Sequence, residues 1–259
     1  MTLAYEPDRS LKGKLRRRLV RLAHRRPLTV GPKGPMLSIS FDDAPATAAL
    51  AGAKILEARG LKGPYYVSAG LAGQEAPMGV CATGADYQRL SAAGHEIACH
   101  THSHIDCGQA TGPEALADCE RNRARLAAWS EAPLRSFAFP YGDVSAGPKQ
   151  ALSEKFTTLR GLHHGVITAG SDLNQVPAVG IEGPGGEATA MTWLETAASR
   201  RAWLILYTHD VADTPSAWGC TPASLERIIA RAIELDFRIG PVGEIADELL
   251  GRVEGPDQG

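Results

Sequence analysis

Short apolar runs alternate with amphipathic stretches along most of the chain. Met36–Phe41 and Trp203–Tyr207 are largely apolar, which is typical of strands buried on both faces of a parallel sheet. Pro113–Trp129 and Pro222–Leu235 carry apolar residues at helical spacing. About seven or eight strand–helix pairs of this kind predict an α/β fold with a parallel sheet, either a barrel or an open doubly wound sheet.

Glycines and prolines separate the expected elements. Strands are expected at 36–41, 63–67, 95–99, 135–139, 156–159, 177–181, 203–207 and 237–239. Helices are expected at 46–59, 85–93, 113–129, 149–154, 189–200 and 222–235, with a helical tail after the last strand. Residues 36–250 are therefore expected to form one domain, followed by a C-terminal tail at 251–259. In both candidate architectures ligands bind at the C-terminal ends of the strands.

Residues 1–35 differ in character and are expected to form a basic N-terminal arm or helix and a linker. Leu11–Arg26 is rich in lysine and arginine, and Leu15, Leu19 and Leu22 fall at helical spacing, which predicts a short amphipathic basic helix. Two interpretations are open. The helix contacts an anionic membrane surface or nucleic acid, or it is a solvated helix on the domain or a disordered arm.

Composition narrows the possible functions. The formal net charge of -2 argues against binding of nucleic acid by the whole surface. The five cysteines have no CxxC spacing, which favours reduced thiols over a disulfide framework. No apolar run reaches the ~18 residues of a transmembrane helix, and the N-terminus lacks the apolar centre of a signal peptide, so we expect a cytoplasmic protein.

Two adjacent acids, Asp42 and Asp43, follow the first buried strand. Burial of an unpaired carboxylate costs several kcal/mol, so such acids need a metal, a cation or a function. The alternative is that one of them caps the following helix.

Histidines follow the strand that ends at Cys99, in the stretch His100-Thr101-His102-Ser103-His104. The four-residue spacing of His100 and His104 suits metal ligation, and Asp43 can supply a third ligand. Two histidines and a carboxylate leave a coordination position for water, as in catalytic zinc sites. The alternative is ordinary hydrogen-bonded histidines, and His102 is expected to have a packing or supporting role.

Two further strand ends carry candidate groups. The turn Pro140-Tyr141-Gly142 can present backbone N–H groups to an oxyanion, or it is a plain turn. His209 follows the most apolar strand and is a candidate general acid, unless it caps a helix or bonds Asp210. The chain lacks GxSxG and GxxxxGK[ST], which argues against a serine hydrolase and a phosphate-cradling loop.

With these residues assembled, the chain resembles the polysaccharide deacetylase family, the NodB-homology domain of carbohydrate esterase family four. The resemblance covers roughly residues 36–250. It rests on four motifs in the family's order: SFDD, HTHSH, FAFPYG and LILYTHD. It implies a distorted (β/α)7 barrel and a deacetylase-like catalytic domain.

The resemblance also implies the reaction. Such an enzyme is a metal-dependent hydrolase that removes acetyl groups from an N-acetylated sugar or polysaccharide, with a zinc-activated water as the nucleophile. The implied catalytic residues are Asp42 as base, His209 as acid and the Tyr141 N–H at the oxyanion. Asp43, His100 and His104 are the implied metal ligands, and Pro140, Tyr141 and Arg160 are expected at the substrate.

The chain departs from the family pattern at three places. Ala44 stands where the family has Gly, and Ala138 where it often has an arginine that orients the base, a role for which Arg160 is the expected substitute. Asp172 or Asp210 is expected to replace the family's acid beside the histidine. A non-catalytic carbohydrate-binding relative of the deacetylases is the alternative function, and an interaction protein acting through Leu11–Arg26 is a third.

Overall fold

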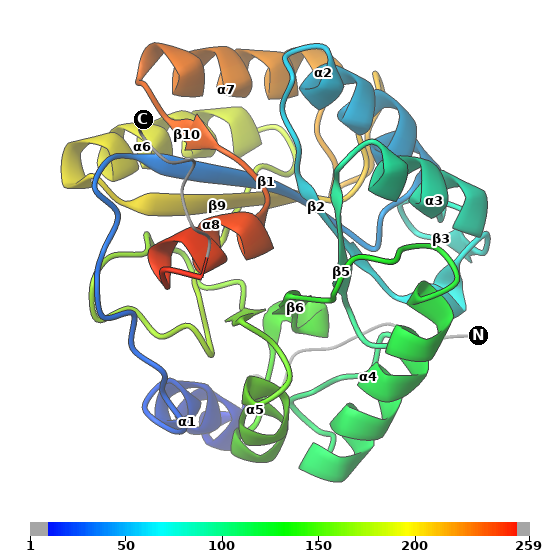
Figure 1. Ribbon diagram of the computed structural model, residues 1–259, viewed down its shortest axis with the longest axis vertical. Helices are drawn as coiled ribbons and strands as arrows, with labels where there is room; N and C mark the ends of the chain where they lie inside the picture. Colours follow the sequence, from blue (N-terminus) through cyan, green and yellow to red (C-terminus); the bar gives the residue numbers. More distant parts are fainter. Residues whose placement is uncertain (1–9, 253–259) are drawn as a thin grey trace.

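The computed structural model describes residues 10–252, so the tail predicted at 251–259 lies largely outside the described residues. Parallel strands form a curled sheet in the order β7-β6-β5-β2-β1-β9-β8, with β10 beside the start of β1 (Figure 1). Its strands are β1 (Met36–Asp42), β2 (Pro64–Val67), β5 (Glu96–Cys99), β6 (Ser136–Ala138), β7 (Thr158–Arg160), β8 (Val179–Gly180), β9 (Trp203–Thr208) and β10 (Arg238–Ile239).

Helices surround this sheet, as Figure 1 shows. They are α1 (Leu11–Val20), α2 (Ala53–Glu57), α3 (Gly84–Ala92), α4 (Gly112–Leu126), α5 (Ala146–Ser153), α6 (Gly186–Arg200), α7 (Pro222–Glu234) and α8 (Val242–Leu249). A π-helical turn (Ala48–Gly52) precedes α2, and short 3-10 turns lie at Ala69–Leu71 and Pro140–Gly142. Part of the loop expected after β2 forms a small antiparallel hairpin of β3 (Glu75–Ala76) and β4 (Gly79–Val80).

The sheet closes irregularly between its two outer strands. The segment before β8 runs beside β7, where Val176 N–H donates to Leu159 O at 2.8 Å and Gly161 N–H donates to Val176 O at 3.0 Å. The same segment then pairs with β9 through Val179 and Leu206. The predicted distorted (β/α)7 barrel is thus confirmed, and the open doubly wound alternative is wrong.

Central strand β1 is buried along its whole length. Its apolar side chains, among them Leu37, Ile39 and Phe41, belong to the largest hydrophobic cluster. The two serines between them are fully buried, and their hydroxyls donate to backbone carbonyls: Ser38 to Gly240 O at 2.8 Å and Ser40 to Leu206 O at 3.0 Å. Because both hydroxyls are satisfied, β1 can be buried on both faces despite these polar residues.

Local signals set the helix starts near the site. Thr83 and Thr111 form capping boxes with Asp86 and Glu114, which satisfy the first N–H groups of α3 and α4. At the end of the barrel where β1 and β9 begin, Met36 and Trp203 pack in one cluster with residues of α8. The opposite end, where the strands finish, is left for the predicted functional residues. No helix within residues 10–252 is both long and apolar enough to cross a membrane.

Candidate active site

Three predicted metal ligands meet at the C-terminal ends of β1 and β5. One ligand atom each from Asp43, His100 and His104 lies within 4.8 Å of the others. Asp43 Oδ1 is 3.7 Å from His100 Nε2 and 3.4 Å from His104 Nε2. Ligand atoms of a tetrahedral zinc site with bonds of about 2.0–2.2 Å are separated by roughly 3.3–3.5 Å. The spacing therefore fits one small divalent ion.

The hydrogen bonds of His100 give this fit a chemical basis. Its Nδ1 lies 2.8 Å from the carbonyl oxygen of Ala138, so Nδ1 carries the proton and Nε2 presents a lone pair toward Asp43. Burial lowers the pKa of His100 to about 4, so the imidazole is neutral at neutral pH. Asp43 Oδ1 is buried and has no hydrogen-bond partner among the described residues. Two acceptors that face each other in a buried site call for a cation between them.

Backbone strain is concentrated around this cluster. Of the eight non-glycine residues with positive φ in the described chain, five are Asp43 (54°), Ala44 (40°), Thr101 (62°), His104 (52°) and Tyr141 (58°). Left-handed backbone costs an L-residue roughly 1–2 kcal/mol and is typical of functional sites. The positive φ at Ala44 also gives a physical reason for the glycine of the family pattern, because glycine adopts this conformation without the Cβ clash.

Asp118 of α4 holds the loop between the two histidines, and the sequence analysis missed it. Its carboxylate accepts the N–H groups of His102 at 2.6 Å and Ser103 at 2.9 Å. The Asp118 side chain is buried in the first half of an amphipathic helix. An acid on the inner face of that helix was the signal that could have indicated it.

The neighbouring acid, Asp42, forms a buried ion pair with Arg160. Arg160 Nη2 donates to Asp42 Oδ2 at 2.5 Å, while Asp42 Oδ1 is buried with no hydrogen-bond partner among the described residues. Burial raises the pKa of Asp42, but the positive charges of Arg160 and His209 and the Arg160 hydrogen bond more than offset this, so its pKa lies below the ordinary value. Asp42 is therefore a carboxylate at neutral pH.

Arg160 lies where the substitute for the missing arginine was expected. Its guanidinium carbon is 4.8 Å from the ring centroid of Tyr66 and 5.2 Å from that of Tyr207. The side chain has no exposed surface. The assignment of Arg160 to substrate contact therefore needs correction, because the group contacts Asp42 and two aromatic rings rather than open space.

His209 bonds an acid that the sequence analysis did not select. Its Nδ1 lies 2.9 Å from Oε1 of Glu182, which follows β8. Burial lowers the pKa of His209, but the Glu182 hydrogen bond and the charges of Asp42 and Asp43 dominate and raise it to about 9. The imidazole is therefore protonated at neutral pH. Glu182 could have been found by the rule used for Asp42, since it too follows the end of a strand.

The two acids predicted to lie beside His209 bond to other residues instead. Asp210 accepts the Ser216 N–H at 2.8 Å, and Asp172 pairs with Lys149 Nζ at 2.7 Å. Neither has a contact with His209 among the described residues. The prediction that Asp172 or Asp210 stands beside the histidine is therefore wrong, and Glu182 takes that place.

The turn at Pro140 and Tyr141 lies beside the ligand cluster. Tyr141 has left-handed backbone angles (φ 58°, ψ 4°), and its ring packs edge-on against His104 with centroids 4.5 Å apart. The Tyr141 side chain is 36% exposed, whereas Pro140 is buried. The structure thus brings this turn to the site.

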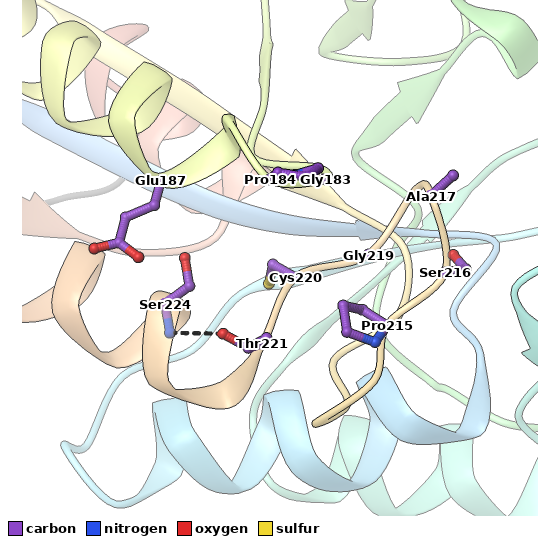
Figure 2. A pocket seen from close by; sticks show the side chains of 10 residues that line it. All are labelled: Gly183, Pro184, Glu187, Pro215, Ser216, Ala217, Gly219, Cys220, Thr221 and Ser224. Carbon is purple, nitrogen blue, oxygen red and sulfur yellow. Dashed lines mark hydrogen bonds between the residues drawn. The ribbon is translucent and has the colours of Figure 1, made fainter.

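A surface cavity of about 470 Å³ is lined by the segment that follows Glu182 and by the loop that follows His209 (Figure 2). It lies between the turn before α6, at Gly183 and Pro184, and the loop that leads into α7 at Thr221. Gly183 directly follows Glu182, and the His209 N–H donates to Trp218 O at 3.0 Å within the same loop. The loops that position His209 therefore also shape this cavity.

Comparison with known proteins agrees with the motifs. Residues 29–156 match the family model of polysaccharide deacetylase. This span contains the Asp42–Asp43 pair, the candidate ligands His100 and His104 and the Tyr141 turn, but ends before His209. No curated protein matches the chain.

Solved structures with this fold include a polysaccharide deacetylase from Mycobacterium smegmatis, which is 16% identical with a TM-score of 0.63 over 90% of this chain and 100% of that chain. A family 4 acetyl xylan esterase from Clostridium thermocellum, in complex with a cobalt ion, is 17% identical with a TM-score of 0.59 over 83% and 92%. A family 4 pseudoenzyme from Bacillus anthracis is 16% identical with a TM-score of 0.56 over 84% and 67%. At these identities the similarity establishes the fold.

Proposed function

Because the chain belongs to the polysaccharide deacetylase family, we propose that it removes acetyl groups from an N-acetylated sugar or polysaccharide with the help of a bound divalent ion, zinc being the best fit. The observation that carries the proposal is the pair of buried acceptors that face each other, Asp43 Oδ1 and His100 Nε2, 3.7 Å apart. A folded protein tolerates such a pair at low cost only when a cation joins them.

Asp43, His100 and His104 would hold the ion. When bound, a zinc ion supplies Lewis-acid chemistry, polarising the acetyl carbonyl and acidifying a water molecule. The Ala138 carbonyl keeps His100 in the tautomer that ligation requires. Asp118 fixes the backbone between the histidines, so both rings are placed before an ion arrives.

Asp42 would act as the general base. Arg160 binds one carboxylate oxygen and leaves Oδ1 to accept a proton from the attacking water. The ion pair both orients the carboxylate and keeps it ionised. This is the base-orienting role predicted for Arg160.

His209 would act as the general acid. Glu182 occupies Nδ1, so the remaining ring N–H at Nε2 is the one available to the leaving amine. A pKa of about 9 keeps the imidazolium charged at neutral pH, as proton donation to an amine requires. Tyr141, beside His104, would contribute its backbone N–H to the oxyanion, and the Pro140 turn would hold it there.

The test is acetate release from N-acetylglucosamine oligomers by the zinc-loaded protein. Chelation should abolish release, and Asp42→Asn should lower the rate about 10²–10⁴-fold while zinc content stays near one equivalent. His100→Ala should lose the zinc itself. Asp213→Asn, which removes an exposed acid outside the site, serves as the control and should keep the parent rate.

Two results would contradict the proposal. A full-rate Asp42→Asn variant would reject Asp42 as the base. A protein that binds zinc and oligosaccharide but releases no acetate would support the non-catalytic alternative. The presence of a base, an acid and three ligand candidates together favours catalysis, because binding alone does not need both proton-transfer groups.

A further inference from the structure

Helix α1 has one face against the barrel and another against solvent. Gly13 and Val20 are buried on the inner face, and Val20 belongs to the cluster around Phe137 and Phe139. In Figure 1 the helix lies at the periphery of the molecule, beside α5. A basic helix thus forms over Leu11–Val20, the first part of the predicted stretch Leu11–Arg26, and packs on the domain.

Specific polar contacts fix α1 in this position. The Arg16 guanidinium donates to the carbonyl of Gly108 and to Asp143 Oδ2, the latter at 2.6 Å. At the C-terminal end, the fully buried Lys149 donates to the carbonyl oxygen of Val20 at 2.8 Å. Anchored at its middle and at its C-terminal end, the helix presents its outer face in a fixed orientation.

Leucines line that outer face. Four leucines are exposed, in contrast to the buried Val20: Leu11 (84%), Leu15 (57%), Leu19 (55%) and Leu22 (73%). The first three are four residues apart and so lie on one side of the helix. Exposed single leucines are common, but a row of three on one helix, continued by Leu22 in the turn after it, marks an interaction surface.

Cations flank the leucines. Four basic side chains are exposed: Lys14, Arg18, Arg21 and Arg25. Residues 10–30 contain no aspartate or glutamate. The outer surface of α1 and of the turn after it thus combines an apolar row with positive charge that no acid of its own segment offsets. This is the composition of helices that lie in the interface of an anionic membrane, with leucines in the acyl boundary and cations at the headgroups.

We propose that the outer face of α1 and of the turn after it, formed by these four leucines and four cations, docks on an anionic lipid surface. Nucleic acid would match the cations equally well, but phosphate contacts give no use for four exposed leucines. The leucines therefore decide between the two partners. The proposed lipid-binding surface is separate from Asp42, His209 and the candidate ligand cluster. Failure of the lipid-binding proposal would therefore leave the deacetylase proposal unaffected, and the reverse also holds.

Co-sedimentation with vesicles tests the proposal on the full chain without substrate. The protein should bind vesicles of phosphatidylcholine and phosphatidylglycerol, bind pure phosphatidylcholine far more weakly, and lose affinity as salt rises. A variant with Leu11→Ser, Leu15→Ser, Leu19→Ser and Leu22→Ser should lose at least about tenfold in affinity. Arg18→Glu with Arg21→Glu should do the same.

Matched variants exclude general effects of hydrophobicity and charge. Leu50→Ser removes a leucine that is 59% exposed outside α1, and Lys54→Glu with Arg200→Glu repeats the change in net charge elsewhere. Both should bind as the parent does. Because the substituted leucines are exposed, the circular dichroism spectrum and melting temperature should stay close to the parent values.

Three outcomes would overturn the proposal. The first is a parent protein that does not bind the anionic vesicles, and the second is a leucine variant that binds them with undiminished affinity. The third is binding to duplex DNA that exceeds vesicle binding and survives the leucine substitutions, which would assign the surface to nucleic acid.

Discussion

At the scale of single residues, the contact between Glu182 and His209 has the clearest consequence for chemistry. The 2.9 Å hydrogen bond and the nearby carboxylates raise the pKa of His209 to about 9, although burial opposes this. The protonated ring is therefore favoured by folding. Its contribution to stability is complete below the unfolded-state pKa of about 6.5 and is lost as the pH rises through about 9.

We expect Glu182→Gln to lower the pKa of His209 by at least about one unit, because it removes both a charge and the acceptor for the charged ring. Proton NMR titration of the metal-free protein measures this directly. The alkaline limb of acetate release should move to lower pH in the same variant, since His209, the proposed general acid, then loses its proton at lower pH.

Glu187→Gln is the matched control for that substitution. Glu187 lies on α6, five residues further along, and pairs with Arg227 at 2.7 Å rather than with His209. It should leave the titration of His209 unchanged. An unaltered pKa in Glu182→Gln would show that Asp42 and Asp43, not Glu182, set the protonation of the ring.

At the scale of elements, the backbone at the end of α6 is strained at a residue for which we propose no functional role. Arg201 caps the helix in the left-handed conformation with φ 49°, and its side chain is exposed. This position is usually glycine, because a Cβ there meets the backbone. Asp43 and His104 also have positive φ, but they belong to the candidate ligand cluster, whereas Arg201 does not.

Arg201→Gly should therefore raise the free energy of unfolding by about 1 kcal/mol and the melting temperature by roughly 2–4 °C. Arg200→Gly, one residue earlier in regular helix, should instead lower the stability by about 0.5–1 kcal/mol. Thermal and urea unfolding measure both. If the free energy of unfolding changed in the same direction in both variants, backbone conformation would not govern stability at this helix end.

At the scale of the whole molecule, the ligand cluster joins distant parts of the chain. Asp43 follows β1, and the two histidines follow β5. A ligand that binds only the folded protein raises stability by about 2.7 kcal/mol at one hundred times its dissociation constant. Bound zinc would thus link the two segments and oppose their separation on unfolding.

We expect zinc at that concentration to raise the melting temperature by roughly 5–10 °C, as measured by differential scanning calorimetry. His104→Ala should remove most of this shift, because it deletes one of the three proposed ligands. His163→Ala removes a histidine outside the cluster and should retain the shift. A zinc-induced shift that persists in His104→Ala would place the ion elsewhere.

The sequence by itself determined the features that depend on neighbours along the chain. Apolar runs, with the glycines and prolines between them, predicted most strands and helices to within a few residues, because burial of both faces and the interruption of regular structure are local requirements. The Asp42–Asp43 pair and the spacing of His100 and His104 were visible for the same reason. Because functional groups in this class of fold follow the ends of strands, the sequence also predicted that these residues meet at one site.

Only the tertiary structure decided the contacts between separate loops. Periodicity cannot say whether a parallel sheet closes, which here depends on the irregular segment beside β7. It also could not choose Glu182 over Asp172 and Asp210 for His209, since that choice depends on which loop end lies within hydrogen-bond distance. In the same way, the two faces of α1 became distinct only when Val20 was buried and the leucines of that helix were left in solvent.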